Sequence, residues 1–310
     1  MSHASPPSPR VRSGAMIGIG LMLLGTFLFS MNDVMGKWLV ATYSVGQILL
    51  LRGLAALAVL LPIMRQQNVP IRVPPQPGLH AFRILLSTLE VSCFYWAVTY
   101  LPLADVMTYY LAGPIYVAAF AAFLLGERID KPRIAAIAVG FVGVLIALRP
   151  SPATVSWPAL IALAGSMFYS LLMITTRKLR DTDDGTLVLG QMLGNVIFGI
   201  AVAPFAWVAP GWLDLAGLFL LGIVSMAGHA CVNRSLKIAP ASVVAPYQYT
   251  LIVWAIVLGY LAFGDIVGFW TLVGAGVICT AGVALLFLER EAARRGREAR
   301  DIKNPVLPEA

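Results

Sequence analysis

The stretch LPLADVMTYYLAGPIYVAAFAAFLLGE, residues 101–127, recurs in the second half of the chain as APASVVAPYQYTLIVWAIVLGYLAFGD, residues 239–265. The strongest matches are Pro102 with Pro240, Tyr109 with Tyr247, Gly126 with Gly264 and Glu127 with Asp265. Weaker matches place Gly25, Ser30, Lys37 and Leu39 over Gly165, Ser170, Arg177 and Leu179, and the pair Gly46 and Gln47 over Gly190 and Gln191. The two halves of the chain therefore repeat each other.

The composition is far too apolar for a soluble domain. Hydrophobic residues make up 59% of the chain and charged residues only 12%, with a mean hydropathy of +0.83, whereas about a quarter of an ordinary globular domain is charged. Ten apolar segments are each near the ~20 residues that span a bilayer core as a helix. They are residues 14–36, 43–64, 80–100, 104–125, 133–149, 157–177, 187–207, 212–236, 240–262 and 268–288.

We therefore expect an all-α integral membrane protein with ten transmembrane helices arranged as two inverted five-helix repeats. The repeats occupy residues 14–149 and 157–288, between an N-terminal tail at 1–13 and a basic C-terminal tail at 289–310. Because five spans is an odd number, the second repeat enters the bilayer from the opposite side. Inverted repeats are typical of secondary transporters, in which two opposed halves rock around a site near the midplane.

The basic residues predict the orientation, since Lys and Arg near helix ends are retained on the cytoplasmic side. A multi-pass arrangement with both termini inside leaves Arg149 as the one basic residue of an outer loop. The net charge of +7 is then explained by topology and by lipid headgroups, and nucleic acid need not be invoked. The short loops and the missing P-loop motif argue against ATP hydrolysis and against an enzyme. We expect no cofactor and no metal.

Polar residues inside the spans are the candidates for function, because a charge in hydrocarbon is costly and usually faces a cavity and a partner. In the first span, Ser30, Asp33 and Lys37 share one face. Asp33 and Lys37 can pair along the helix, either as an anchor near the outer surface or as part of a site. Arg52 and Glu90 are the deepest opposite charges, suited to a structural ion pair or to handling substrate and protons.

Further polar stripes lie in the second half. Gln191 and Asn195 share a face of the seventh span, and His229 and Asn233 share a face of the eighth with Ser225 and Lys237. The ninth span is interrupted by Pro246, followed by Tyr247, Gln248, Tyr249 and, one turn beyond Thr250, Trp254. Its repeat mate carries Tyr110. Such tyrosines belong either to an interfacial belt or, in a proline-kinked helix, to the lining of a transport cavity.

Three stretches resemble the EamA family of the drug/metabolite transporter superfamily. They are Asn32-Asp33-Val34-Met35-Gly36-Lys37 with Arg52 downstream, Leu124 to Arg128 before Gly140 to Ile146, and Ala245-Pro246-Tyr247-Gln248-Tyr249. The resemblance covers nearly the whole chain. It implies a proton-coupled or exchanging carrier of a bacterial inner membrane, with a central cavity lined by spans 1–4 and 6–9. The first and third stretches are similar to those of S-adenosylmethionine carriers, and the aromatic stretch around Trp254 is similar to that of riboflavin carriers.

The sequence thus predicts a secondary transporter of a small polar organic metabolite, best represented by riboflavin or a similar flat aromatic compound. S-adenosylmethionine or an amino acid is the alternative substrate, and a membrane-embedded transferase is the alternative class. Expected partners are the substrate, the lipid bilayer and a proton or counter-substrate, in a monomer or homodimer. Asp33 and Glu90 are the candidates for proton coupling. The candidate substrate-binding residues are Ser30, Asp33, Lys37, Arg52, Glu90, Tyr110, Gln191, Asn195, His229, Asn233, Tyr247, Gln248, Tyr249 and Trp254.

Overall fold

A computed structural model describes residues 9–67, 75–113, 115–116, 120, 131–148, 156–179, 182–238 and 245–303. In this part of the chain all the regular elements are helical, which confirms the all-α expectation. The helices are α1 (Pro9–Val40), α2 (Val45–Gln66), α3 (Pro77–Tyr100), α4 (Leu103–Leu111), α6 (Lys131–Leu148), α7 (Trp157–Lys178), α8 (Asp184–Val202), α9 (Trp212–Ile238), α11 (Thr250–Phe263) and α12 (Phe269–Lys303), with short 3₁₀ helices η1 (Ala203–Ala206) and η2 (Ala245–Tyr249).

Six helices in the described ranges are long and apolar enough to cross a membrane, namely α1, α2, α3, α7, α8 and α9. Three further apolar helices are shorter, at Ile134–Ala147, Tyr247–Phe263 and Phe269–Ala284. A multi-pass membrane protein is therefore confirmed, and the count of ten spans stays a prediction. The repeat motif at Gly126 and Glu127 lies outside the described residues.

Helix ends follow local chemistry in several places. At the start of α2, the Ser44 side chain accepts a hydrogen bond from the backbone N–H of Gln47. At the start of α8, the Asp183 side chain accepts one from the backbone N–H of Gly185. α11 ends at Gly264, whose φ of 67° lies in the left-handed region that glycine adopts without strain.

The ninth and the last spans differ from simple helices of one span each. The ninth span is interrupted at Pro246, as the sequence predicts: residues 245–249 form a 3₁₀ turn, and the α-helix begins at Thr250. Pro246 explains this, because proline has no backbone N–H and its ring crowds the preceding turn. The last helix extends beyond the apolar span that ends at residue 288. It continues to Lys303 through most of the expected tail, where charged residues suit a helix emerging into water.

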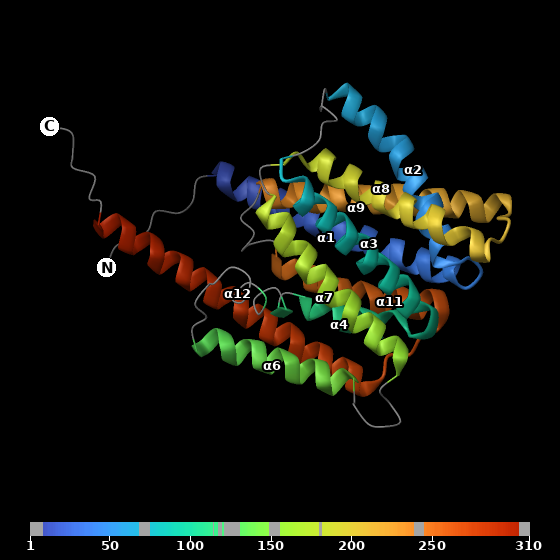
Figure 1. The fold of residues 1–310 in the computed structure, drawn as a ribbon. Coiled ribbons are helices and arrows are strands. Elements are labelled where there is room, and N and C mark those ends of the chain that lie inside the picture. The colour runs from blue at the N-terminus through green and yellow to red at the C-terminus, as the bar shows by residue number, and fades with distance from the viewer. Residues whose placement is uncertain are drawn as a thin grey trace.

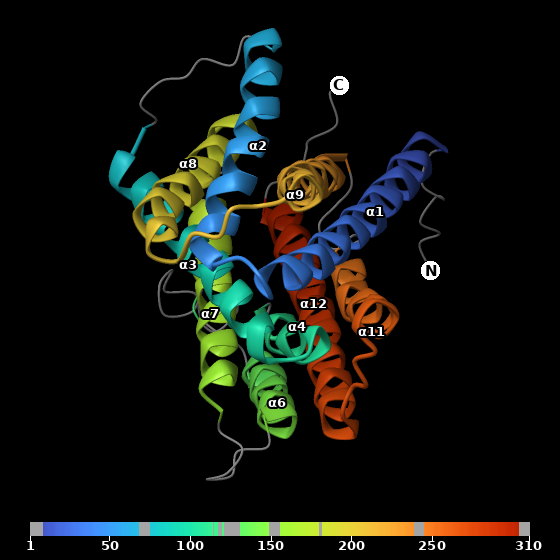
Figure 2. The ribbon, with the colours of Figure 1, turned by 90° about the vertical axis from the view of Figure 1, so that its right-hand side faces the viewer.

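The main helix contacts join the first half of the chain to the second. α1 packs on α9, α2 on α8 and α9, α3 on α7 and α8, α4 on α7 and α11, and α6 on α12. Figures 1 and 2 show α6 and α12 side by side in both views. In the repeat, α1, α2 and α3 are equivalent to α7, α8 and α9. The contact of α1 with α9 is then equivalent to the contact of α7 with α3, and the contact of α2 with α8 is equivalent to itself. This is the pattern that two halves related by a two-fold axis would give.

Glycines let these helices approach closely. A Cβ atom added at Gly274 of α12 would lie 2.6 Å from the Ala147 Cβ atom and 2.7 Å from the Gly143 carbonyl oxygen of α6. Gly190 and Gly194, the small-residue motif of α8, likewise rest against Ile84 and Thr88 of α3. Small residues at such crossings are the usual means of packing helices in membranes.

Candidate functional site

Arg52 of α2 is 3% exposed and lies where three helices meet. One guanidinium nitrogen donates to the Tyr95 hydroxyl of α3 at 2.6 Å, and the other donates to Ser225 Oγ of α9 at 2.8 Å. The guanidinium carbon also lies 5.5 Å from the centre of the Tyr95 ring. The third nitrogen, Nε, is buried without a partner among the described residues. A buried cation with a free donor is suited to receive a ligand atom.

Asp33 of α1 and Glu90 of α3 both lie within electrostatic range of this cation. Arg52 interacts electrostatically with both carboxylates, and the two carboxylates interact with each other. Asp33 also accepts a hydrogen bond of 3.3 Å from the Asn32 side chain. Among the described side chains, no salt bridge joins Arg52 to Glu90. The structural ion pair, one of the two interpretations of these residues, is therefore absent, and neutral hydroxyls hold the guanidinium instead. We call Asp33, Arg52 and Glu90 the central charge cluster.

The charge balance of this cluster is its main chemical property. Two carboxylates share one guanidinium on α1, α2 and α3, so the cluster carries a net charge of −1 when both acids are ionised. A net charge in hydrocarbon is expensive, and a proton or a cationic group of a ligand removes it. The cluster can therefore take up one positive charge.

The helix spacing had suggested that Lys37 pairs with Asp33, but the two side chains do not pair. Its ammonium group forms an ion pair with the Asp265 carboxylate beyond α11 and lies 4.6 Å from the centre of the Phe263 ring. The expectation was wrong because Asp33 is turned towards Asn32 and Arg52, whereas the long lysine stem reaches another helix. Ser30 is fully buried, and its hydroxyl has no partner in the described part of the chain.

The described members of the polar stripes of α8 and α9 are buried or partly buried. Gln191 is 7% exposed and Asn195 is fully buried, with neither amide atom of Asn195 hydrogen-bonded to a described residue. Nδ1 of His229 lies 2.8 Å from the Ser225 carbonyl oxygen, and its ring packs edge-on against Phe29. The side chain of Asn233 lies outside the described residues. His229 is thus linked to the residue that holds Arg52.

The aromatic candidates fall in different places. Tyr110 belongs to the central region, because its hydroxyl donates to the Glu90 carbonyl oxygen at 3.2 Å and its ring packs against Phe94 and Tyr169.

The aromatic residues of the second half contact different neighbours from those of Tyr110. Tyr247 packs near Met22 of α1, whereas the Tyr249 hydroxyl abuts Gly282 of α12. Trp254 packs edge-on against Phe27, and its indole N–H is buried with no partner in the described part of the chain. Gln248, between the two tyrosines, is partly buried. The expected enclosure of one flat ring by all of these side chains is not evident in the packing.

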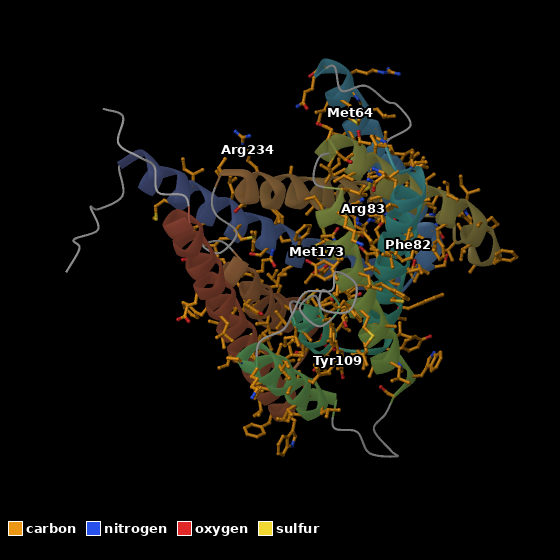
Figure 3. All side chains as sticks on the ribbon, turned by 60° about the vertical axis from the view of Figure 1, so that its left-hand side comes forward. Met64, Phe82, Arg83, Tyr109, Met173 and Arg234 are labelled. Atoms are coloured by element: carbon orange, nitrogen blue, oxygen red, sulfur yellow. The ribbon has the colours of Figure 1, made fainter. Side chains whose placement is uncertain are left out.

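Tyr95 escaped the sequence reasoning. It holds Arg52 together with Ser225, which the sequence had placed in the polar stripe of the eighth span, whereas Tyr95 carries no signal beyond a polar group in an apolar span. Arg83, the other buried cation of this region, donates to Thr176 Oγ1 at 2.9 Å and to the Leu187 carbonyl oxygen at 3.0 Å. Figure 3 shows Arg83 on α3 within the bundle, while Arg234 projects away from α9.

Contacts between the two halves also brace the end of the molecule where α1 ends and α2 begins. The Tyr43 hydroxyl donates to the Asp214 carboxylate at 2.6 Å. This hydrogen bond raises the pKa of Tyr43, because ionisation would break the bond and set a phenolate against a carboxylate. The side-chain amide of Gln47 donates from Nε2 to the Val208 carbonyl oxygen and accepts at Oε1 from the Val208 backbone N–H.

Within the described ranges, no three His, Cys, Asp or Glu side chains come together as metal ligands would. A buried cluster of unlike charges between paired helices is instead the arrangement of a multi-pass membrane transporter. The chain belongs to the EamA-like transporter family, whose profile matches it twice, over residues 16–149 and 156–288.

Curated relatives span nearly the same length. The S-adenosylmethionine uptake transporter of Rickettsia conorii is 24% identical over 92% of this chain and 97% of its own. The pseudopaline exporter CntI of Pseudomonas aeruginosa is 27% identical over 86% and 95%, and the riboflavin transporter of Rhizobium johnstonii is 25% identical over 92% and 95%. A crystal structure with a TM-score of 0.61 covers 89% of this chain and 98% of its own at 19% identity, which supports the fold alone.

Proposed function

We propose that this protein is a secondary transporter that moves a small polar metabolite across a bacterial inner membrane by alternating access between its two halves. The observation that carries the proposal is the central charge cluster, in which one guanidinium is shared by two carboxylates. Such a cluster is costly in a bilayer unless it serves a ligand or an ion. The chain would be multi-pass with both termini inside the cell.

The substrate that suits this cluster best carries a positive or zwitterionic group. A cation would neutralise the excess carboxylate, and the Nε–H of Arg52, which has no partner among the described residues, would donate a hydrogen bond to an anionic or carbonyl oxygen of the same molecule. S-adenosylmethionine has both kinds of group, and a relative is named for its uptake. In the absence of a cationic substrate, a proton on Asp33 or Glu90 would play the same electrostatic part.

Riboflavin is the second candidate. The buried indole N–H of Trp254 has no described partner and would meet a carbonyl oxygen of a flat ring, and one relative is named a riboflavin transporter. An aromatic ring also binds by stacking, which requires no charge. The two candidates therefore predict different key residues, Arg52 with its carboxylates for the first and Trp254 for the second.

A thermal-shift screen of the detergent-purified protein against S-adenosylmethionine, riboflavin, amino acids and nucleosides tests the proposal, because a ligand that binds only the folded state raises Tm. Each stabilising compound is then offered to proteoliposomes as a radiolabelled substrate. Uptake of at least one compound above empty liposomes is expected. If no compound is bound or moved with or without a pH gradient, the proposed function is wrong.

A further inference from the structure

Lys37 and Asp265 join two helix ends from opposite halves of the chain. Lys37 lies in the last turn of α1, and Asp265 follows the glycine that ends α11. Their ion pair is only partly exposed, with 14% and 20% of the two side chains accessible. The Phe263 ring lies beside the ammonium group. The pair thus closes a contact between α1 and α11 at one end of the bundle.

The same end contains other helix termini. Asp105, at the start of α4, interacts electrostatically with both Lys37 and Asp265. Further along this end, Tyr43 bonds Asp214 at the start of α9, and Gln47 bonds Val208 just before it. The central charge cluster lies deeper, because Asp33 is one turn before Lys37 in α1 and Tyr95, which holds Arg52, packs against Gly36.

The repeat alignment gives this pair a counterpart in sequence. Lys37 aligns with Arg177 and Asp265 aligns with Glu127, so a basic and an acidic residue stand at both aligned positions. The side chains of Arg177 and Glu127 lie outside the described residues. In an inverted repeat, equivalent positions fall at opposite membrane surfaces.

We propose that the Lys37–Asp265 ion pair is a latch that holds this end of the bundle closed over the central charge cluster and must break for the cluster to open to that side. The proposal rests on the proposed transport function. A single, partly exposed ion pair is weak enough to open thermally, yet it shifts a near-balanced equilibrium between two conformations when it is removed. The neutral contacts around it would stay formed in the latched state.

Cys93 offers a reporter that needs no substrate. It lies in α3 beside Glu90, with which it interacts electrostatically, and its Cβ atom lies 3.0 Å from the position of a Cβ added at Gly165. Replacing the other two free cysteines, Cys231 and Cys279, by serine leaves Cys93 as the single thiol. Its rate of modification by a membrane-impermeant methanethiosulfonate then reports access to the cluster from the side where the reagent is added.

The experiment compares K37A, D265N and the exchange K37D/D265K in this background, in intact cells and in inverted vesicles. Loss of the latch should raise the modification rate of Cys93 about fivefold, and only when the reagent is added on the Lys37 side. The rate rises because removing one such ion pair increases the population of the open conformation by about this factor. The exchanged pair should restore the slow rate. S235A is the matched control, because it removes the contact between Ser235 and the Gly18 carbonyl oxygen near the other end of α1 and leaves the pair intact.

Unchanged rates in both single variants would overturn the latch, as would an equal rise from both sides that the exchange does not reverse, since that pattern indicates general loosening. Elution as a single species from size-exclusion chromatography establishes that each variant is folded. Because labelling is measured without substrate, its outcome is independent of transport. If the wild type moves no compound but K37A and D265N still show the one-sided rise in labelling, the proposed function is refuted and the latch stands.

Discussion

The guanidinium of Arg52 donates a hydrogen bond of 2.6 Å to the hydroxyl of Tyr95, and both side chains are almost fully buried. The bond joins α2 to α3, and a second bond from Arg52 to Ser225 extends the link to α9 in the other half. A strong cation is thus fixed by neutral partners rather than by a carboxylate. This leaves Asp33 and Glu90 able to exchange a proton or a ligand without releasing Arg52.

Replacing Tyr95 by phenylalanine should destabilise the protein and weaken transport together. The ring is retained, but Arg52 loses an acceptor, and a hydrogen bond to a charged group contributes about 1.5–3 kcal/mol. We expect a lower Tm and a higher KM for substrate, and a similar result for S225A. Thermal unfolding in detergent and proteoliposome uptake measure both. Tyr260→Phe, at a side chain that is 61% exposed, is the control expected to match the wild type.

Gly36 should not tolerate alanine. A Cβ atom at this position would overlap the Tyr95 ring and lie 2.9 Å from its hydroxyl oxygen. Overpacking of this kind costs about 1–3 kcal/mol, so G36A should lower Tm and displace the ring that holds Arg52. Gly20 on the same helix has open space where a Cβ would be. G20A should leave Tm unchanged or raise it, because alanine favours helix over glycine.

The position of the helices was largely predictable, whereas the partners of the charges were not. Length and hydropathy are local properties, and the structure has a helix at each expected span in the described ranges. The partner of Lys37 lies 228 residues away in sequence, and only the packing of α1 with α11 brings Asp265 within reach. The local candidate, Asp33, was equally compatible with the spacing.

For the site too, local properties were predictable from the sequence, whereas contacts between distant residues were not. Burial of Asp33, Arg52 and Asn195 follows from the cost of polar groups in hydrocarbon, and the structure buries all three. Tyr95 gives no such signal, because a tyrosine in an apolar span is ordinary and its role depends on Arg52 arriving from another helix. The aromatic residues around Pro246 were grouped by sequence proximity, but the 3₁₀ turn and α11 send their side chains to α1 and α12 instead.

Asn195 distinguishes a binding residue from a packing residue. Its amide is fully buried and has no described partner, which costs stability in a site that is empty. N195A should therefore keep or raise Tm while reducing uptake at least tenfold, the opposite pattern from a structural asparagine. A fall in Tm with unchanged uptake per folded molecule would assign it to packing. Thr280→Ala, an exposed threonine bonded within its own helix, is the neutral comparison.

Glu90 provides the most direct test of proton coupling. E90Q keeps the size of the side chain but removes the titrating group, and Asp33 remains to neutralise Arg52, so the protein should fold with a Tm near that of the wild type. If Glu90 carries the proton, uptake driven by a pH gradient should be abolished while counterflow exchange of labelled for unlabelled substrate persists. D33N in the same assays measures how much Asp33, the other carboxylate of the cluster, contributes to proton coupling. D214N is the control, because the carboxylate that it replaces lies near the end of the bundle and asparagine can still accept from Tyr43. Retained uptake in E90Q with the pH dependence of the wild type would remove Glu90 from the coupling mechanism.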